Sequence, residues 1–135
     1  MTEKRPFVLR KEQNSVEINL GVCSGRHEMP VDNFVFDTIV DPTDVETLER
    51  KALEWYRSNV TPLREEGLNV DINIYVTGLT VATIAIVKVF IHQHEWAIDN
   101  DYPCIVHNGD ITLWHFDATG KDYYPQKLFN GAFRD

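Results

Sequence analysis

The fold of this chain is decided by one stretch, Val70-Asp71-Ile72-Asn73-Ile74-Tyr75-Val76-Thr77-Gly78-Leu79-Thr80. Its apolar residues alternate with polar or aromatic ones up to position 76, which is the period of a β-strand. An almost continuous apolar run, Val81 to Ile91, follows the Thr-Gly turn and is too long for a typical strand. The pattern therefore predicts a strand at 70–76, a turn at 77–80 and a buried helix that continues to about Trp96.

The turn at 77–80 has the geometry of an anion-binding site. The N–H groups of the turn and the positive end of the helix dipole point the same way, as they do where proteins bind phosphate. Thr77 and Thr80 add hydroxyl groups, and Thr80 is placed to cap the helix. Capping by Thr80 and turning at Gly78 would also explain these residues without a ligand, so both interpretations stay open.

The segments before this stretch predict two strands and a helix. Alternation over 16–22 predicts the first strand, and the more uniformly apolar segment 34–40 predicts a second, more central strand. The sequence Asp41-Pro42-Thr43-Asp44 is a strong helix opening, and Thr61-Pro62 interrupts the helix that follows. Residues 1–15 form a loose lead-in, in which 7–9 could add a short edge strand.

After the apolar helix, Ile111–Phe116 predicts a further strand, and Tyr123–Phe129 predicts a hairpin return. Strand–helix–strand units form parallel pairs through right-handed crossovers. We therefore expect a single α/β domain over residues 1–135, with a small Rossmann-like, mainly parallel sheet, two main helices and a C-terminal hairpin. Two helices barely cover one face of such a sheet, so the other face is either partly exposed to water or covered by a partner. A homodimer is the expected state.

The composition limits the kinds of partner. A net charge of -8 argues against non-specific binding of duplex nucleic acid. The apolar run at 81–91 is shorter than the ~20 residues of a membrane-spanning helix. Two cysteines and no signal peptide indicate reduced intracellular thiols. We expect a soluble cytoplasmic protein that binds neither duplex nucleic acid nor a membrane.

Three loops are expected to meet at the carboxyl edge of the parallel strands, where open α/β sheets bind ligands. In the first of them, Ser24, Gly25, Arg26 and His27 follow the first strand. Arginine can hold a phosphate, histidine can transfer a proton, and glycine lets a ligand approach the backbone. An ordinary polar hairpin with a surface arginine and histidine is the alternative. The three loops span residues 23–30, 77–80 and 115–124.

The third loop belongs to a group formed by residues 114–117 and 123–126, which includes His115, Tyr124 and Gln126. Aromatic rings with a glutamine can stack on a base and hydrogen-bond to it. The packed end of a sheet is the alternative interpretation of the same cluster.

Metal and cofactor motifs are missing from the sequence. His92 and His94 are two residues apart and point to different faces of the predicted helix, and no Cys-x-x-Cys occurs. The chain has neither a Walker sequence nor Gly-x-Gly-x-x-Gly, which disfavours ordinary NTPase and dinucleotide functions. Cys23 lies near His27 in the sequence, which would suit a thiol nucleophile. An ordinary buried or surface cysteine is the favoured interpretation of Cys23. We expect no metal and no cofactor.

The segment from Asp71 to Ala82, followed by an apolar helix and the strand at 111–116, resembles the CARF domain. This CRISPR-associated Rossmann fold senses cyclic oligoadenylates, and its small stand-alone relatives include ring nucleases that cleave the cyclic messenger. In such domains a strand ends in a Thr-Gly-Gly or similar turn that opens an apolar helix. Thr77, Gly78 and Thr80 carry over by position, whereas Leu79 stands where many such domains have a second glycine.

The resemblance implies a nucleotide-type phosphate ligand, a cyclic oligoadenylate, held by a two-fold dimer that places two copies of the turn around a symmetric ring. It also implies metal-independent cleavage, in which a ribose 2′-hydroxyl attacks the neighbouring phosphate. The catalytic candidates are Arg26, His27 and His115, of which none carries over from the family. The ligand-binding candidates are Ser24, Gly25, Thr77, Gly78, Thr80, Tyr124 and Gln126.

Two other functions remain open from the sequence. One is a non-catalytic accessory protein that binds another protein through its acidic surface and open sheet face. The other is a small phosphohydrolase or transferase that uses the same loops.

Overall fold

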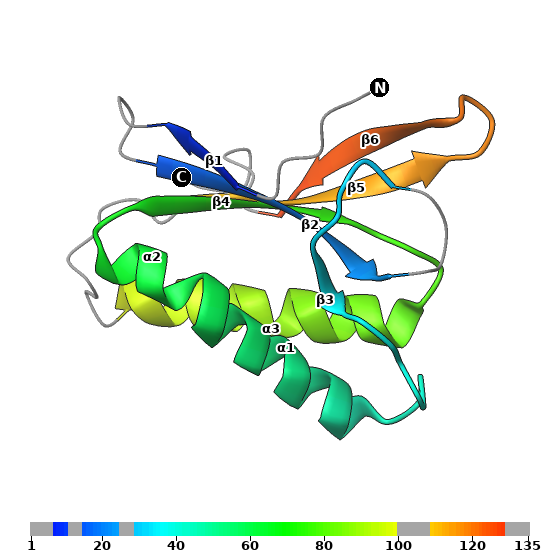
Figure 1. The fold of residues 1–135 in the computed structure, drawn as a ribbon, viewed down its shortest axis with the longest axis horizontal. Coiled ribbons are helices and arrows are strands. Elements are labelled where there is room, and N and C mark those ends of the chain that lie inside the picture. The colour runs from blue at the N-terminus through cyan, green and yellow to red at the C-terminus, as the bar shows by residue number, and fades with distance from the viewer. Residues whose placement is uncertain (1–6, 11–14, 25–28, 100–108, 129–135) are drawn as a thin grey trace.

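The computed structural model describes residues 7–10, 15–24, 29–99 and 109–128. These residues form a mixed β-sheet with helices packed on one of its faces (Figure 1). The strands are β1 (Phe7–Arg10), β2 (Ser15–Cys23), β3 (Phe34–Phe36), β4 (Asn69–Tyr75), β5 (Ile111–Asp117) and β6 (Asp122–Lys127). The helices are α1 (Val45–Asn59), α2 (Thr61–Glu65) and α3 (Thr80–Asp99).

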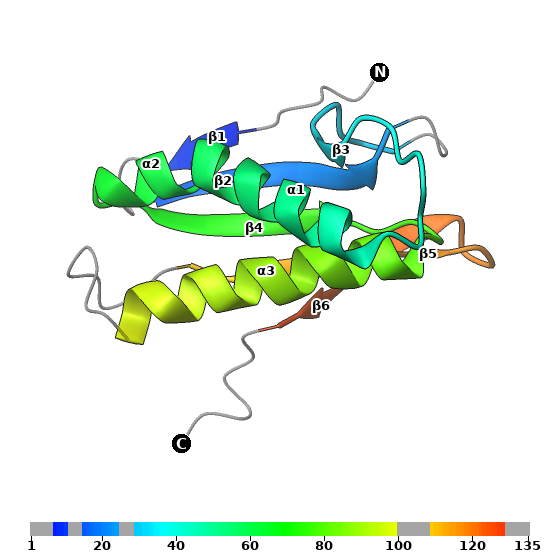
Figure 2. The same ribbon diagram turned by 90° about the horizontal axis from the view of Figure 1, so that it is seen from below.

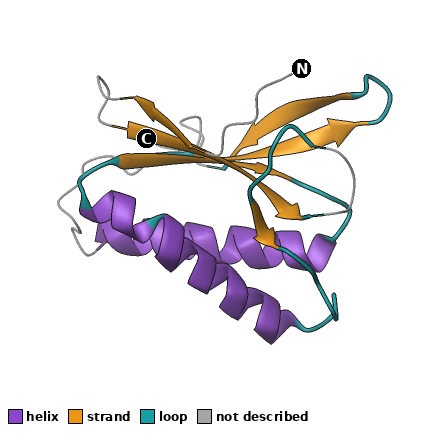
Figure 3. Cartoon of the chain, viewed as in Figure 1, coloured by secondary structure: helices purple, strands orange, loops and turns teal. Residues whose placement is uncertain are grey.

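The sheet has the strand order β1-β2-β4-β5-β6, and β3 pairs with β2 beside β1. The strands β2, β4 and β5 are parallel neighbours in the order in which they occur along the chain, with the short β3 between β2 and β4 in sequence. The strands β1 and β6 add antiparallel pairs at the two sides. This arrangement confirms the predicted α/β fold with a mainly parallel sheet, two main helices and a C-terminal hairpin (Figure 3).

The two long helices lie side by side on the same face of the sheet (Figure 2). Helix α1 lies in the connection from β2 to β4, and α3 in the connection from β4 to β5. Right-handed crossovers between successive neighbouring strands place both helices on one face. The hydrophobic core fills the space between this face and the helices, and it includes Ile18, Leu20, Ile72, Ile74, Ile111, Leu48, Ala52, Ile86 and Phe90.

The segment 34–40 does not form the longer, central strand that its apolar composition predicts. Strand β3 has three residues and pairs only with β2, near Gly21 and Cys23. The outer edge of β2 is shared, because β1 occupies the part from Ser15 to Ile18. Val40 is 93% exposed, so the apolar run continues into a surface loop rather than into the core.

The predicted helix signals are confirmed. The Asp44 carboxylate accepts a hydrogen bond from the Thr47 N–H at 3.2 Å and so caps α1. Helix α1 ends at Asn59, and Pro62 lies in the first turn of the short α2. Proline is favoured there because the first-turn N–H groups have no partner inside the helix. The edge strand expected at 7–9 is present as β1.

None of the helices in the described part of the chain is both long and apolar enough to cross a membrane.

A buried polar network joins α1, α2, α3 and the start of β4. The Tyr56 hydroxyl contacts Nδ1 of His94 at 2.5 Å and accepts a hydrogen bond from the Arg64 guanidinium. The other ring nitrogen, Nε2 of His94, lies 3.4 Å from the Val70 carbonyl, which can only accept. Nε2 therefore carries the proton, and Nδ1 accepts from Tyr56. Arg64 also donates to the Gln93 and His94 carbonyls of α3.

We predict that Tyr56→Phe lowers the free energy of unfolding by about 1–3 kcal/mol, because it leaves Arg64 without its hydroxyl acceptor and His94 without its donor. Urea denaturation measures the change. Tyr124→Phe is the matched control, since Tyr124 is 53% exposed and its variant should unfold at the wild-type midpoint. Equal midpoints for the two variants would contradict a stabilising role for the network.

The Tyr56 hydroxyl makes the free energy of unfolding depend on pH in the alkaline range. Burial raises the pKa of Tyr56 to about 12, against the lowering effect of Arg64. An unfolded tyrosine titrates near about 10, so the folded chain keeps a proton that the unfolded chain releases. We predict that the free energy of unfolding falls as the pH rises from about 10 to about 12. Tyr56→Phe should reduce this slope without abolishing it, because burial also raises the pKa of Tyr75 and Tyr123.

Candidate functional site

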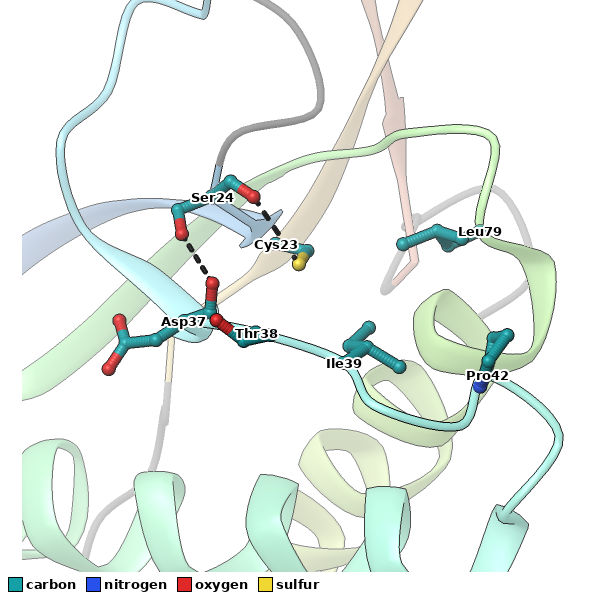
Figure 4. A pocket seen from close by; sticks show the side chains of 7 residues that line it. All are labelled: Cys23, Ser24, Asp37, Thr38, Ile39, Pro42 and Leu79. Carbon is teal, nitrogen blue, oxygen red and sulfur yellow. Dashed lines mark hydrogen bonds between the residues drawn. The ribbon is translucent and has the colours of Figure 1, made fainter.

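A pocket of about 250 Å³ opens at the carboxyl edge of the sheet (Figure 4). It lies where β2 and β3 end and where the turn after β4 enters α3. This is the edge at which the sequence places the ligand site. The lining residues are Cys23, Ser24, Asp37, Thr38, Ile39, Pro42 and Leu79.

Ser24, from the first predicted loop, is hydrogen-bonded to the segment that follows β3 in the pocket wall. The Ser24 hydroxyl donates to the Asp37 carbonyl at 2.6 Å, and the Ser24 N–H donates to the Phe36 carbonyl at 3.1 Å. These two bonds hold the end of β2 against the end of β3. Figure 4 shows the Asp37 carboxylate pointing away from Cys23 and Leu79, so the part of the wall near Leu79 is largely apolar.

The turn at 77–80 is held by its own first residue. The Thr77 hydroxyl oxygen accepts a hydrogen bond from the Leu79 N–H at 3.2 Å. The Leu79 carbonyl accepts from the Thr83 N–H at 3.0 Å, which is the first bond of α3 and makes Leu79 the N-cap residue. The prediction that Thr80 caps the helix is therefore wrong, because Thr80 is already its first helical residue.

Leucine at the N-cap leaves the start of α3 without a side-chain acceptor. Serine, threonine, aspartate and asparagine are preferred there because their oxygen accepts from an early N–H group. Among the residues that the structure describes, none accepts a hydrogen bond from the N–H of Thr80, Val81 or Ala82. Within the described part of the chain, the positive end of this twenty-residue helix has no side-chain acceptor beside the pocket.

Gly78 is exposed, and its role is not dictated by the fold. A Cβ atom added there would meet no heavy atom within 4 Å, and the backbone is not in the left-handed region. Gly109 is different, because its φ is +94° and a Cβ would lie 2.2 Å from the Val70 carbonyl oxygen. Gly109 is needed for packing, whereas Gly78 is free to serve the approach of a ligand.

The third predicted loop does not reach this pocket. Nε2 of His115 lies 2.9 Å from the Gln126 side-chain oxygen, and its ring is 5.4 Å from that of Tyr124. These three residues come from the β5–β6 hairpin, and none of them lines the pocket. Of the first loop, Gly25, Arg26 and His27 lie outside the described residues. The structure therefore joins Ser24 and the 77–80 turn, through Leu79, at one pocket.

Four lining residues were not identified as site residues from the sequence: Asp37, Thr38, Ile39 and Pro42. They lie in the segment assigned to a longer strand and to the opening of α1. Since β3 ends at Phe36, the chain that follows leaves the sheet and folds over the carboxyl edge. The Pro42 that starts the helix signal also forms part of the wall.

Two aspartates border the pocket, Asp37 at the end away from Leu79 and Asp41 next to Pro42, which lies beside the start of α3 (Figure 4). Asp41 precedes the lining residue Pro42, and hydrogen bonds from the hydroxyl and N–H of Thr43 hold the pKa of its carboxyl below the ordinary value. Asp37 lies on the same segment. An anionic group of a ligand is therefore disfavoured near the Asp37 carboxylate. No cluster of potential metal ligands occurs among the described residues.

Comparisons of the chain with protein-family models, with curated proteins and with solved structures found no match.

We predict that Gly78→Ala keeps or raises stability, by about 0.4–1 kcal/mol, because alanine restricts the unfolded chain and fits the folded turn. Gly109→Ala should lower stability by more than this, since the folded backbone cannot accept the new Cβ without moving. Thermal unfolding of both variants beside the wild type tests the pair. A strongly destabilised Gly78→Ala would show that this glycine is structural.

Proposed function

We propose that this protein binds a nucleotide-type phosphate ligand at the carboxyl edge of its sheet, and that a cyclic oligoadenylate is the ligand of first choice. The observation that carries the proposal is the uncapped start of α3 beside the pocket. Free N–H groups and the helix dipole together favour an anion at such a position. The resemblance of the 71–82 segment to CARF domains supplies the identity of the ligand.

The proposal assigns a direction to the ligand. Its phosphate lies against the N–H groups of Thr80, Val81 and Ala82, away from the carboxylate of Asp37. The Thr38 hydroxyl can bond to a sugar or base, and Cys23, Ile39 and Leu79 supply apolar contacts. A cavity of about 250 Å³ is smaller than typical drug-sized pockets, so it would hold one nucleotide unit while the rest of a ring stays outside.

Cleavage of the ligand is a separate proposal. In-line attack of a ribose 2′-hydroxyl on the adjacent phosphate would give a 2′,3′-cyclic phosphate and release the 5′-hydroxyl of the next nucleotide. The reaction needs a base, an acid and a cation near the phosphate. No described lining residue is a histidine, lysine or arginine. Cleavage would therefore depend on Arg26 and His27.

We predict that a cyclic oligoadenylate raises the thermal unfolding midpoint of the wild-type protein, because a ligand that binds only the folded state stabilises it. Linear oligoadenylates, AMP and inorganic phosphate form the comparison set. Unchanged midpoints with every one of these compounds would remove the proposal.

Leu79→Asp tests whether the ligand binds at the start of α3. The new carboxylate at the N-cap would accept hydrogen bonds from the early N–H groups of the helix and would repel a phosphate. The variant should lose the ligand-induced shift. Leu79→Ala is the matched control, since it removes the same side chain without adding an acceptor, and it should keep part of the shift. Equal ligand shifts in wild type and Leu79→Asp would place the ligand elsewhere.

A further inference from the structure

No helix in the described part of the chain lies over the face of the sheet opposite α1 and α3 (Figures 1 and 2). We call this the open face. Near the end of β2 it is already covered, because Phe34 and Met29 lie within 3 Å of the position of a Cβ on Gly21. Alternation and strand register place these residues on the rest of it: Glu17, Asn19, Asp71, Asn73, Tyr75, Thr112, Trp114, Phe116, Tyr123, Pro125 and Lys127.

Aromatic rings form the centre of the open face. Tyr75 stacks on Trp114 with ring centroids 5.8 Å apart, and Tyr123 meets Tyr75 edge-on at 5.0 Å. Phe116 packs edge-on against Tyr123 and is 47% exposed. The rings already restrict one another, so covering them costs little side-chain entropy. Tyrosine and tryptophan are also the residues most enriched in protein interfaces.

The polar side chains beside these rings are hydrogen-bonded within the face. The Asn73 amide donates to Glu17 at 2.9 Å and to Asn19 at 2.8 Å. The Trp114 indole N–H donates to the Asn73 side-chain oxygen at 3.0 Å. Covering a polar group costs little when its hydrogen bonds are already made inside the protein. The open face can therefore be buried without stranding these donors.

Charge is unevenly distributed across the open face. Register places Asn19, Asn73, Thr112 and Lys127 in one row, from β2 to β6. Glu17 and Asp71 lie two residues earlier on β2 and β4. Among the open-face residues named above, the carboxylates thus lie on β2 and β4 and the single ammonium group lies on β6.

We propose that the open face packs against the open face of a second copy of this chain, about a two-fold axis parallel to the strands. This rotation places β6 of each copy over β2 of the other, so Lys127 lies over Asn19, two residues along the strand from Glu17, and its long side chain can reach the Glu17 carboxylate at two symmetric places. It also places β4 over β5, so the Tyr75–Trp114 clusters meet at the centre. A two-fold axis in the plane of the sheet but across the strands would instead place β2 over β2, acid against acid. Face-to-face sheets commonly pack about 10 Å apart with nearly aligned strands.

This geometry keeps the strand direction the same in both copies. The carboxyl edges, and with them the two pockets, therefore face the same end of the dimer. The dimer is independent of the proposed ligand, because none of the pocket-lining residues belongs to the open-face set.

The test is the molar mass of the full chain in solution by light scattering or sedimentation equilibrium. The measurement is made at about 0.15 M salt, which screens repulsion between acidic copies. The wild type should have twice the 15.6 kDa mass of the chain. Lys127→Glu should weaken the dimer at least about tenfold, since like charges facing each other are strongly unfavourable. Lys51→Glu is the matched control: it makes the same charge change at an exposed site on α1 and should stay dimeric.

A charge-exchanged double variant tests whether Lys127 of one copy contacts Glu17 of the other. Glu17→Lys alone should weaken association, and combining it with Lys127→Glu should restore it, because the pair is exchanged in both copies. Circular dichroism and the thermal midpoint confirm that each variant is folded. A monomeric wild type, a dimer that Lys127→Glu leaves unchanged, or a double variant no tighter than the singles would overturn the proposal.

Discussion

Both long helices lie on one face because β2, β4 and β5 are joined in chain order by crossovers of the same hand (Figure 1). Each strand is added beside the previous one, so the order never reverses within this parallel part. One face acquires the core, and the other keeps alternating polar and aromatic side chains. The buried network of Arg64, Tyr56 and His94 then ties the helix layer to the start of β4, at the opposite end from the pocket.

The same constraint leaves two places for function. One is the carboxyl edge, where the loop after β3 folds toward the start of α3 and forms a pocket wall. Leu79 at the N-cap is poor for helix stability and good for an external anion, since it leaves early N–H groups unpaired. The other is the open face, whose polar groups are already hydrogen-bonded within the sheet. A binding site at the edge and a partner on the face do not compete for residues.

Strong periodicity made the parallel strands and helices predictable. The alternation around Ile72 and Ile74 predicts a strand, and the apolar run after Leu79 predicts a helix by its length, although its β-branched residues favour a strand; both predictions are confirmed. The prediction for the segment 34–40 was wrong in length and position, because only Phe34–Phe36 pair with β2 and Val40 is exposed to solvent. The site was only half predictable. The local sequence correctly indicates a turn at 77–80. It does not show that His115 pairs with Tyr124 in the β5–β6 hairpin and so lies away from the pocket. Only the three-dimensional course of the chain after Phe36 brings Ile39 and Pro42 to the edge.

The most direct test of the central claim is an NMR titration of backbone amides with a cyclic oligoadenylate. If the carboxyl edge binds the ligand, the shifted amides cluster at Thr38 and Ile39 and at the start of α3, from Gly78 to Ala82. The amides of Asn73 and Trp114 on the open face then stay in place. Saturating ligand that shifts no amide, or that shifts the open face and leaves Gly78 to Ala82 unchanged, would contradict the claim.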